Sequence, residues 1–208
     1  IIVINPGIEP VEKLNNESLK EAEKILKGKS PRLITVSRYD KRKSHEKIIM
    51  ALRNLKQIYP NIIYTSIGYG EEEENVKKLA KELSLDKQVL FLKNVSLELK
   101  NSLVAKSHVF VMPSITYKKS VEGFGIAYVE AAQFGIPSIG GKDGGASDAI
   151  EHNKTGMICD GNNLDEIYAS LNSMIENKRY LELGKNAKEY VSKFNWEKII
   201  LEYKKILN

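Results

Sequence analysis

Short apolar runs rich in β-branched residues alternate along the chain with longer segments in which apolar side chains recur every three or four positions. The short runs predict buried strands, and the longer segments predict amphipathic helices. Strands are expected over residues 1–4, 33–37, 62–67, 89–92, 109–112, 137–139 and 157–159. Helices are expected over residues 17–27, 45–59, 71–83, 98–105, 125–134 and 146–150, and then in succession over 164–176, 180–194 and 196–207.

Alternating strands and helices of these lengths are typical of right-handed strand–helix–strand units. The fold class they predict is α/β: a Rossmann-like, doubly wound parallel sheet with helices on both faces, followed by C-terminal helices. No internal repeat, linker or charge block divides the chain, so residues 1–208 are expected to form a single domain. In such sheets ligands bind at the carboxyl ends of the strands, and the loops that follow the strands therefore matter most.

The amino-acid composition indicates which cellular compartment and which classes of binding partner to expect. The 208 residues carry 32 Lys and Arg against 27 Asp and Glu, and a net charge of +5 is weak support for nucleic-acid binding. Cys159 is the only cysteine, so neither an internal disulfide nor a multi-cysteine zinc site can form. No apolar run approaches the roughly 20 residues of a membrane span, and the opening residues lack a signal-peptide pattern. A cytoplasmic protein that binds no nucleic acid is expected.

Several common motifs of nucleotide-binding and hydrolytic proteins are absent. Gly68 and Gly70 offer only the opening pair of a GxGxxG dinucleotide motif. Gly135 and Gly140 have the spacing of a P-loop, but Gly141 stands where its lysine should. The three histidines lie far apart, and there is no HExxH, Asp-x-Asp or GxSxG sequence, so a metal site or a hydrolase triad has little support. Each histidine is expected to be a surface or packing residue.

A basic loop follows the strand predicted over residues 33–37. It places four cations within six residues, just before a predicted helix: Arg38, Lys41, Arg42 and Lys43. Free N–H groups at a helix N-terminus, guanidinium groups and lysines all favour an anion such as a diphosphate. The alternative is a solvated basic turn, and the loop alone does not decide between the two.

A second loop begins a segment that carries two carboxylates with seven residues between them. Glu122 precedes Gly123 and Gly125, and Glu130 lies further along the helix that follows. The glycines allow backbone to approach a ligand closely, and a third loop over residues 140–148 supplies four more. The alternative is an ordinary acid at a helix start and an exposed helix glutamate. Together the three loops describe a pocket for a nucleotide diphosphate joined to a polyhydroxylated group, because cations hold phosphates and carboxylates accept hydrogen bonds from hydroxyls.

The order of these motifs resembles that of a known family along almost the whole chain. The segments that carry the resemblance are NPGIEP, LITVSRYDKRKSHEKII, SIGYGEEEENVKKLAKEL, VLFLKNVSLELKNSLVAKSHVFVMPS, EGFGIAYVEAAQFGIPSIGGKDGGASDAI and HNKTGMICD. They resemble the C-terminal, donor-binding half of retaining GT-B glycosyltransferases of family 4, the glycosyltransferase group 1 domain. Ser37 and Ser44 stand where that family has glycines, and Tyr69 where a small or acidic residue is usual.

The resemblance implies roles for individual residues. Arg38 and Lys43 match the cations that bind the donor diphosphate, Glu122 matches the carboxylate that contacts the donor sugar, and these three are the expected catalytic residues. Glu130 matches the acid that binds the ribose hydroxyls. The other expected donor-binding residues are Gly68 in the Gly-x-Gly segment, Val95 in the nucleobase loop, and Gly123, Phe124, Gly125 and Ile126, whose backbone meets sugar and phosphate. The family implies neither a metal nor a cofactor.

The resemblance also implies what the whole protein does. It would be one half of a GT-B fold and would transfer a hexosyl or mannosyl group from a nucleotide sugar to a glycan or glycolipid acceptor. The acceptor site would lie in an N-terminal domain that precedes these residues, and the full-length protein would contact the inner face of the membrane peripherally. The long segment over residues 115–121 resembles a mannosyltransferase-like subgroup. The alternatives are a nucleotide-binding regulatory module without transfer activity, and an epimerase or phosphorylase on the same frame.

Overall fold

A six-stranded parallel sheet forms the centre of the computed structural model, which describes residues 2–11 and 13–207. The strand order is β3-β2-β1-β4-β5-β6, and every neighbouring pair is parallel. The strands are β1 (Arg32–Val36), β2 (Ile63–Ile67), β3 (Val89–Leu92), β4 (Val109–Met112), β5 (Ser138–Gly141) and β6 (Gly156–Cys159). The predicted doubly wound α/β fold is thereby confirmed.

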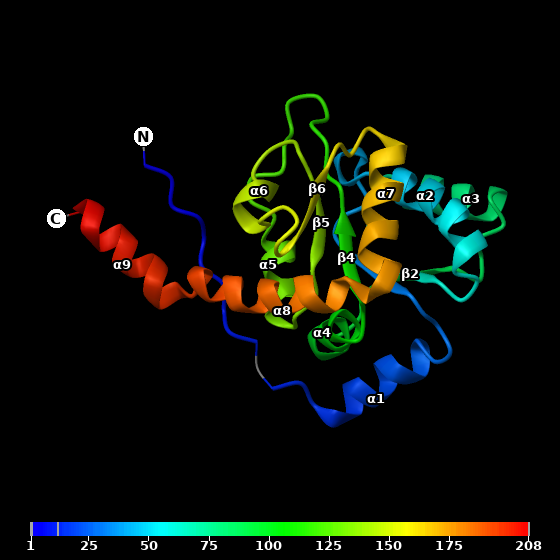
Figure 1. Cartoon of the computed structure of the whole chain (residues 1–208), viewed down its shortest axis with the longest axis horizontal. Helices are drawn as coiled ribbons and strands as arrows, with labels where there is room; N and C mark the ends of the chain where they lie inside the picture. Colours follow the sequence, from blue (N-terminus) through cyan, green and yellow to red (C-terminus); the bar gives the residue numbers. More distant parts are fainter. Residues whose placement is uncertain (1, 12, 208) are drawn as a thin grey trace.

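Helices cover both faces of the sheet (Figure 1). They are α1 (Asn16–Ile25), α2 (His45–Ile58), α3 (Glu73–Glu82), α4 (Leu97–Ala105), α5 (Ile126–Gln133), α6 (Ala146–Ala149), α7 (Leu164–Ile175), α8 (Tyr180–Tyr190) and α9 (Trp196–Leu207). Each predicted helix is present, with ends shifted by a few residues. The helix expected over residues 180–194 ends at Tyr190 and continues as a 3₁₀ turn over Val191–Phe194.

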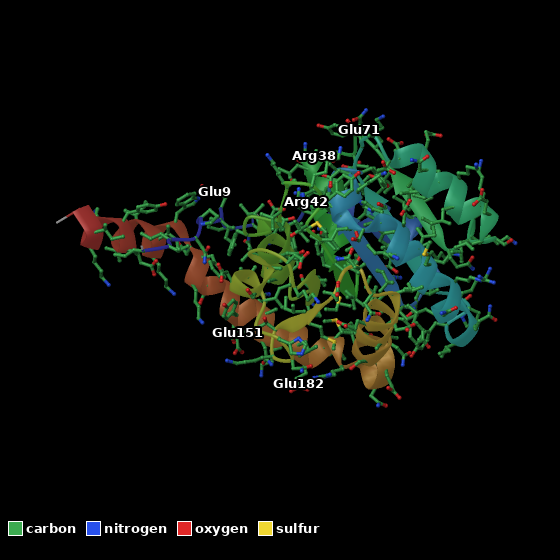
Figure 2. The ribbon with its side chains drawn as sticks, turned by 90° about the horizontal axis from the view of Figure 1, so that it is seen from above. Glu9, Arg38, Arg42, Glu71, Glu151 and Glu182 are labelled. Atoms are coloured by element: carbon green, nitrogen blue, oxygen red, sulfur yellow. The ribbon has the colours of Figure 1, made fainter. Side chains whose placement is uncertain are left out.

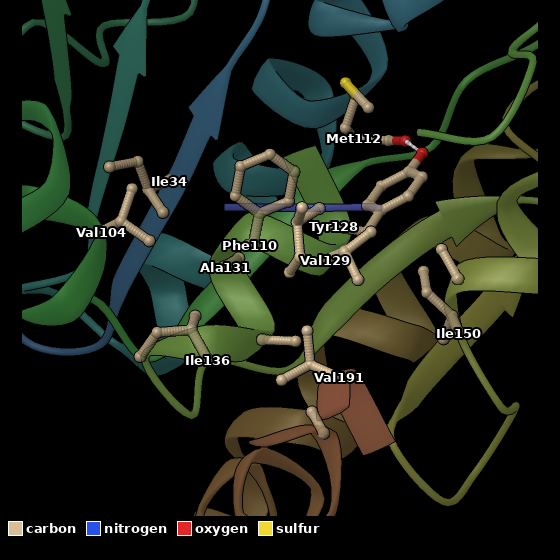
Figure 3. Packing of buried hydrophobic residues seen from close by; sticks show 14 of the residues in the cluster. Ile34, Val104, Phe110, Met112, Tyr128, Val129, Ala131, Ile136, Ile150 and Val191 are labelled. Atoms are coloured by element: carbon tan, nitrogen blue, oxygen red, sulfur yellow. Dashed lines mark hydrogen bonds between the residues drawn. The ribbon is translucent and has the colours of Figure 1, made fainter. Parts of the chain in front are cut away.

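Two hydrophobic cores lie on opposite faces because successive strand residues point in opposite directions. Leu33 belongs to the core that contains side chains of α2, α3 and α7, whereas its neighbour Ile34 belongs to the core that contains side chains of α1, α4, α5 and α8. Val109 and Phe110 divide between the two cores in the same way. Figure 3 shows Ile34 and Phe110 packed against Val104 of α4 and side chains of α5. Strands buried on both faces explain why the apolar runs in the sequence are continuous.

The strand expected over residues 1–4 is wrong for the part that the structure describes, and Ile1 lies outside the described residues. Ile2 and Val3 are in no strand and their side chains are exposed. Ile8 instead pairs with Asn195, next to the start of α9, and its N–H donates to the carbonyl of Phe194. An apolar run forms a strand only where a sheet edge is available for pairing, and here the chain is held beside α9.

The last helix extends away from the sheet (Figure 1). Ile200, Leu201, Tyr203 and Ile206 on α9 are about half exposed. Within residues 2–11 and 13–207, no helix has both the length and the apolar character that crossing a bilayer requires.

Candidate functional site

The basic loop connects the end of β1 to α2 at the carboxyl edge of the sheet. Residues Lys41–Lys43 form a single 3₁₀ turn, and Ser44 then adopts a left-handed conformation with φ 55° before α2 begins. The turn directs the side chains of Arg42 and Lys43 into the protein, whereas the Arg38 side chain is 70% exposed. Figure 2 shows Arg38 and Arg42 on the same side of the molecule. One loop therefore supplies both buried and exposed cations.

The carboxylate of Glu122 meets the buried cations of this loop. Its Oε2 accepts a hydrogen bond from Lys43 Nζ, a second from Arg42 Nη1 at 2.9 Å and a weaker one from Ser114 Oγ at 3.4 Å. The Glu122 carbonyl accepts from the N–H of Gly145 at 2.9 Å. The structure thus joins two loops that the sequence separates by about 80 positions, and the glycine-rich loop fixes the backbone of one of them.

Burial and charge act in opposite directions on this cluster. Burial alone would raise the pKa of Glu122, but its hydrogen bonds and charge interactions with Lys43 and Arg42 outweigh burial and lower that pKa. Burial lowers the pKa of Lys43, and Glu122 opposes that change. Glu122 is therefore ionised at neutral pH, in a site where its side chain is only 12% exposed.

Close backbone packing explains the glycines around Glu122. A Cβ on Gly145 would lie 1.9 Å from the carbonyl oxygen of Gly123. Gly125 has φ 81° and immediately precedes α5, with the Tyr128 ring against its Cα. The Tyr128 hydroxyl donates to the Met112 carbonyl at 2.6 Å (Figure 3), which ties this turn to the end of β4. The segment before α5 is thereby held by backbone contacts, which leaves its exposed side open.

Phe124 does not face that open side. Its ring is buried and packs against Phe194, with 5.2 Å between ring centroids. Of the segment over residues 123–126, the backbone and the exposed Ile126 side chain are therefore what a ligand could contact. The first turn of α5 adds N–H groups that have no partner within the helix.

A hollow of about 480 Å³ lies beside the basic loop, between the ends of β1, β2 and β3. Arg38, Gly68 and Val95 all line it, together with Ser37, Tyr69, Asn94 and Lys100. A Cβ on Gly68 would lie 1.9 Å from the Ser37 carbonyl oxygen, so only glycine allows the two loops to approach this closely. Three predicted donor-binding residues thus share one cavity wall.

Glu130 and Ile126 line a second hollow, of about 830 Å³, on the side of α5 that faces α4 and residues 7–11 and 13–15. Lys100 borders both hollows, and its Nζ lies 3.8 Å from a carboxylate oxygen of Glu130. Lys100 therefore connects the hollow that holds Arg38 with the one that holds Glu130.

His45, the first residue of α2, is buried and contacts Ser37 and Arg38 at the start of the basic loop. Tyr64 donates its hydroxyl proton to Thr35 Oγ1 at 2.9 Å, and the Tyr64 oxygen lies 3.0 Å from His45 Nδ1. His45 Nε2 lies 3.0 Å from Ser37 Oγ and 3.3 Å from the carbonyl oxygen of Arg38. His45 is a packing residue as predicted, and it also fixes the residue that precedes Arg38.

The described parts of the chain contain no group of three or more His, Cys, Asp or Glu side chains arranged to hold a metal ion. Besides cations, carboxylates and backbone amides, the carboxyl edge of the sheet carries the hydroxyl groups of Ser37 and Ser114.

Comparison with known proteins identifies the family. The family model of glycosyl transferases group 1 matches residues 17–193. The chain belongs to this family. A GDP-mannose-dependent alpha-(1-6)-phosphatidylinositol monomannoside mannosyltransferase of Mycobacterium tuberculosis is 30% identical over 82% of the chain and 45% of that enzyme. The chain spans about half the length of the curated relatives it matches.

Solved structures agree on the fold. The C-terminal domain of LpcC, a glycosyl transferase group 1 protein of Francisella tularensis, superimposes with a TM-score of 0.72 over 90% of this chain and 95% of that domain, at 20% identity. Anabaena HepE in complex with UDP superimposes with a TM-score of 0.78 over 93% of this chain and 53% of that structure, at 23% identity. The group 1 domain thus has the fold of the C-terminal half of a GT-B protein, as the sequence resemblance implied.

Contacts at the site of this group 1 domain involve residues that the sequence alone did not indicate. Arg42 was one cation among four, yet it contacts Glu122 directly, whereas Arg38 does not. Ser114, at the end of β4, and Lys100, on α4, were not singled out. The available signal for Arg42 was its place next to Lys43, but sequence does not show which cations of a short loop turn inward. The proposed binding roles of Arg38, Lys43, Gly68, Val95, Glu122 and Glu130 remain predictions.

Proposed function

We propose that this group 1 domain is the donor-binding half of a retaining glycosyltransferase that uses a nucleotide sugar. The observation that carries the proposal is the contact between Lys43 and Glu122. Arg38, in the same loop as Lys43, lines the hollow of about 480 Å³. A cation for phosphate and a carboxylate for sugar hydroxyls lie side by side, which is what a sugar diphosphate requires. Membership of the family supports the same function.

The diphosphate is bound by Arg38, by Lys43 and by the N–H groups in the first turn of α5. The Arg38 side chain is exposed and lies 3.9 Å from Asp40, so solvent screens this pair and the guanidinium can turn towards a ligand. When the sugar leaves, negative charge develops on the diphosphate, and preorganised cations and N–H groups stabilise that charge. Neither residue needs to form a covalent bond.

Glu122 takes the donor sugar, and the backbone of Gly123, Phe124, Gly125 and Ile126 lies against sugar and phosphate. Glu130 takes the ribose hydroxyls from the adjoining hollow, and Gly68 and Val95 form the wall against the base. This assignment gives the two glutamates separate tasks, one on each side of the diphosphate.

The transferred group is a hexose, with mannose favoured by the GDP-mannose-dependent relative. HepE was solved with UDP, so both bases belong in the test. The acceptor is a glycan or glycolipid whose site lies in the other half of the full-length enzyme, and the enzyme acts in the cytoplasm at the inner face of the membrane.

Calorimetry with UDP, GDP, ADP, UDP-glucose, GDP-mannose and ADP-glucose tests the proposal on this chain. One base is expected to bind saturably, and its sugar conjugate more tightly than the bare diphosphate. Lys43→Met is expected to weaken both ligands, and Glu122→Gln only the gain from the sugar. Equal binding of conjugate and diphosphate would favour a regulatory nucleotide site, and no binding at millimolar ligand would contradict donor binding by this domain.

A further inference from the structure

The two oxygens of the Glu122 carboxylate have different surroundings. All three hydrogen bonds that the carboxylate accepts from the described residues end on Oε2, from Lys43, Arg42 and Ser114. Protein contacts therefore hold one oxygen, while Oε1 remains for a hydroxyl group of a ligand. A carboxylate held at one oxygen keeps its direction, which an unrestrained glutamate side chain would not.

A bound donor would compete with Glu122 for the ammonium group of Lys43. A diphosphate carries more negative charge than a carboxylate, and the ammonium group of lysine is a mobile point charge on a flexible stem. If Lys43 turned towards the phosphates of a bound donor, its hydrogen bond to Oε2 would weaken. The orientation of Glu122 must then come from another donor.

Arg42 is placed to provide it. Its side chain is 11% exposed, its Nη1 donates to Glu122 at 2.9 Å, and its Nη2 lies 3.8 Å from Asp40. Its own carbonyl accepts from the N–H of Ile115 at 2.8 Å, which fixes the backbone of the loop to the segment that follows β4. Because Glu122 and Asp40 contact its two terminal nitrogens, the planar guanidinium of Arg42 is less free than the Lys43 ammonium group to turn towards a bound ligand.

We infer that Arg42 is the positioning residue for Glu122: it holds Oε2 when Lys43 moves to the diphosphate, keeps Oε1 directed at the donor sugar, and so sets how much the sugar contributes to binding. The inference rests on the proposed donor-binding function. It assigns Arg42 to sugar recognition, although it lies in the loop that otherwise binds phosphate.

The test compares the nucleotide affinities of the wild-type chain with those of the variants Arg42→Met, Arg42→Lys and Arg53→Met. Arg53 is an exposed arginine of α2, and its replacement removes the same charge away from the site. The measured quantity is the ratio of the affinities for UDP-glucose and UDP, or for GDP-mannose and GDP. Arg42→Met is expected to reduce this ratio about 10-fold, the size of one charge-assisted hydrogen bond. The affinity for the bare diphosphate should change much less, and Arg42→Lys should retain part of the ratio.

A second measurement does not depend on any nucleotide. The pKa of the Glu122 carboxyl, followed by NMR, should rise towards the ordinary glutamate value in Arg42→Met and stay unchanged in Arg53→Met. An unchanged Glu122 titration in Arg42→Met would overturn the inference, whether or not nucleotides bind. Equal losses for diphosphate and conjugate would also overturn it and would make Arg42 a phosphate ligand. If the wild-type chain bound no nucleotide while the titration changed, the contact would stand, but the donor-binding function and the role in sugar recognition would both fail.

Discussion

Lys43 and Glu122 lie 79 positions apart in the sequence and form an ion pair in the structure. Lys43 follows β1 and Glu122 follows β4, two strands that are neighbours in the parallel sheet. Parallel strands bring their carboxyl ends to the same edge, so the loops that follow them meet there. The topology of the sheet, rather than any local motif, thus places a cation against a carboxylate.

Replacing Glu122 by Gln should destabilise the protein. Gln keeps the shape of the side chain but removes the charge that Lys43 pairs with and leaves Arg42 with the more distant Asp40 at 3.8 Å. This change is expected to lower the free energy of unfolding by about 3 kcal/mol. In the double variant Lys43→Met/Glu122→Gln the loss should be smaller than the sum of the single losses, because one of the uncompensated charges is also removed. Urea unfolding of the four proteins measures this coupling.

The exposed pair Lys78–Glu82 on α3 is the matched control. These side chains are 78% and 57% exposed, at 3.7 Å. Their coupling in the same cycle is expected to be at most about 0.5 kcal/mol. Equal coupling in the two pairs would show that burial at the site contributes nothing.

Much of the fold follows from local patterns in the sequence. Residues 109–112 form a continuous apolar run, which predicts a strand buried on both faces, and the strand is present. Ile2 and Val3 are also apolar, but their side chains are exposed and they lie in no strand. Hydrophobicity therefore predicts a strand only together with a partner, and the partner is set by tertiary structure.

The site is predictable as a set of loops but not as a set of contacts. The basic loop was identified, and so was Glu122. Which cations turn inward depends on the 3₁₀ turn at Lys41–Lys43 and on the left-handed Ser44, and this geometry comes from how the loop packs on Ile115 and Glu122. Arg38 and Arg42 are arginines of the same basic loop, but the Arg38 side chain is 70% exposed and the Arg42 side chain only 11%.

His45 should make stability depend on pH in the acid range. Burial lowers the pKa of His45 from 6.5 to about 4, so folding favours the neutral ring. The unfolded chain binds a proton below pH 6.5 and the folded chain only near pH 4, so the stabilisation is complete above pH 6.5 and is lost as the pH falls towards 4. The expected loss across this window is about 3 kcal/mol.

Chemical denaturation of the wild type and of His45→Gln between pH 7 and pH 4 measures this contribution. The difference between their free energies of unfolding should shrink as the pH falls, because only the wild type carries the buried imidazole. NMR titration of the His45 ring in the intact protein gives its pKa directly, and an ordinary value near 6.5 would contradict the expectation.

Gly145 and Gly123 should respond differently to the same added methyl group. A Cβ on Gly145 would fall 1.9 Å from the Gly123 carbonyl oxygen, whereas nothing lies within 4 Å of a Cβ on Gly123. Gly145→Ala is expected to cost about 2 kcal/mol and to displace the backbone of Glu122. Gly123→Ala should change stability by no more than about 0.5 kcal/mol.

The two variants therefore separate structure from binding. If donor backbone contacts occur where we propose, Gly123→Ala should weaken the sugar conjugate while the thermal midpoint stays unchanged, since the methyl group would occupy space next to the sugar. Unchanged calorimetric affinity for that variant would place the donor elsewhere.

Glu130 offers the complement to Glu122. Its side chain is 46% exposed and its contact with Lys100 is 3.8 Å long, so Glu130→Gln should change the free energy of unfolding by no more than about 0.5 kcal/mol. If it binds ribose, the affinities for diphosphate and conjugate should fall together, by roughly 10-fold, with their ratio unchanged. Glu98→Gln, which removes another acid of the same hollow, is the control. Because ribose is common to both ligands and the sugar is not, a change in the ratio for Glu130→Gln would mean that the two glutamates do not divide the donor as proposed.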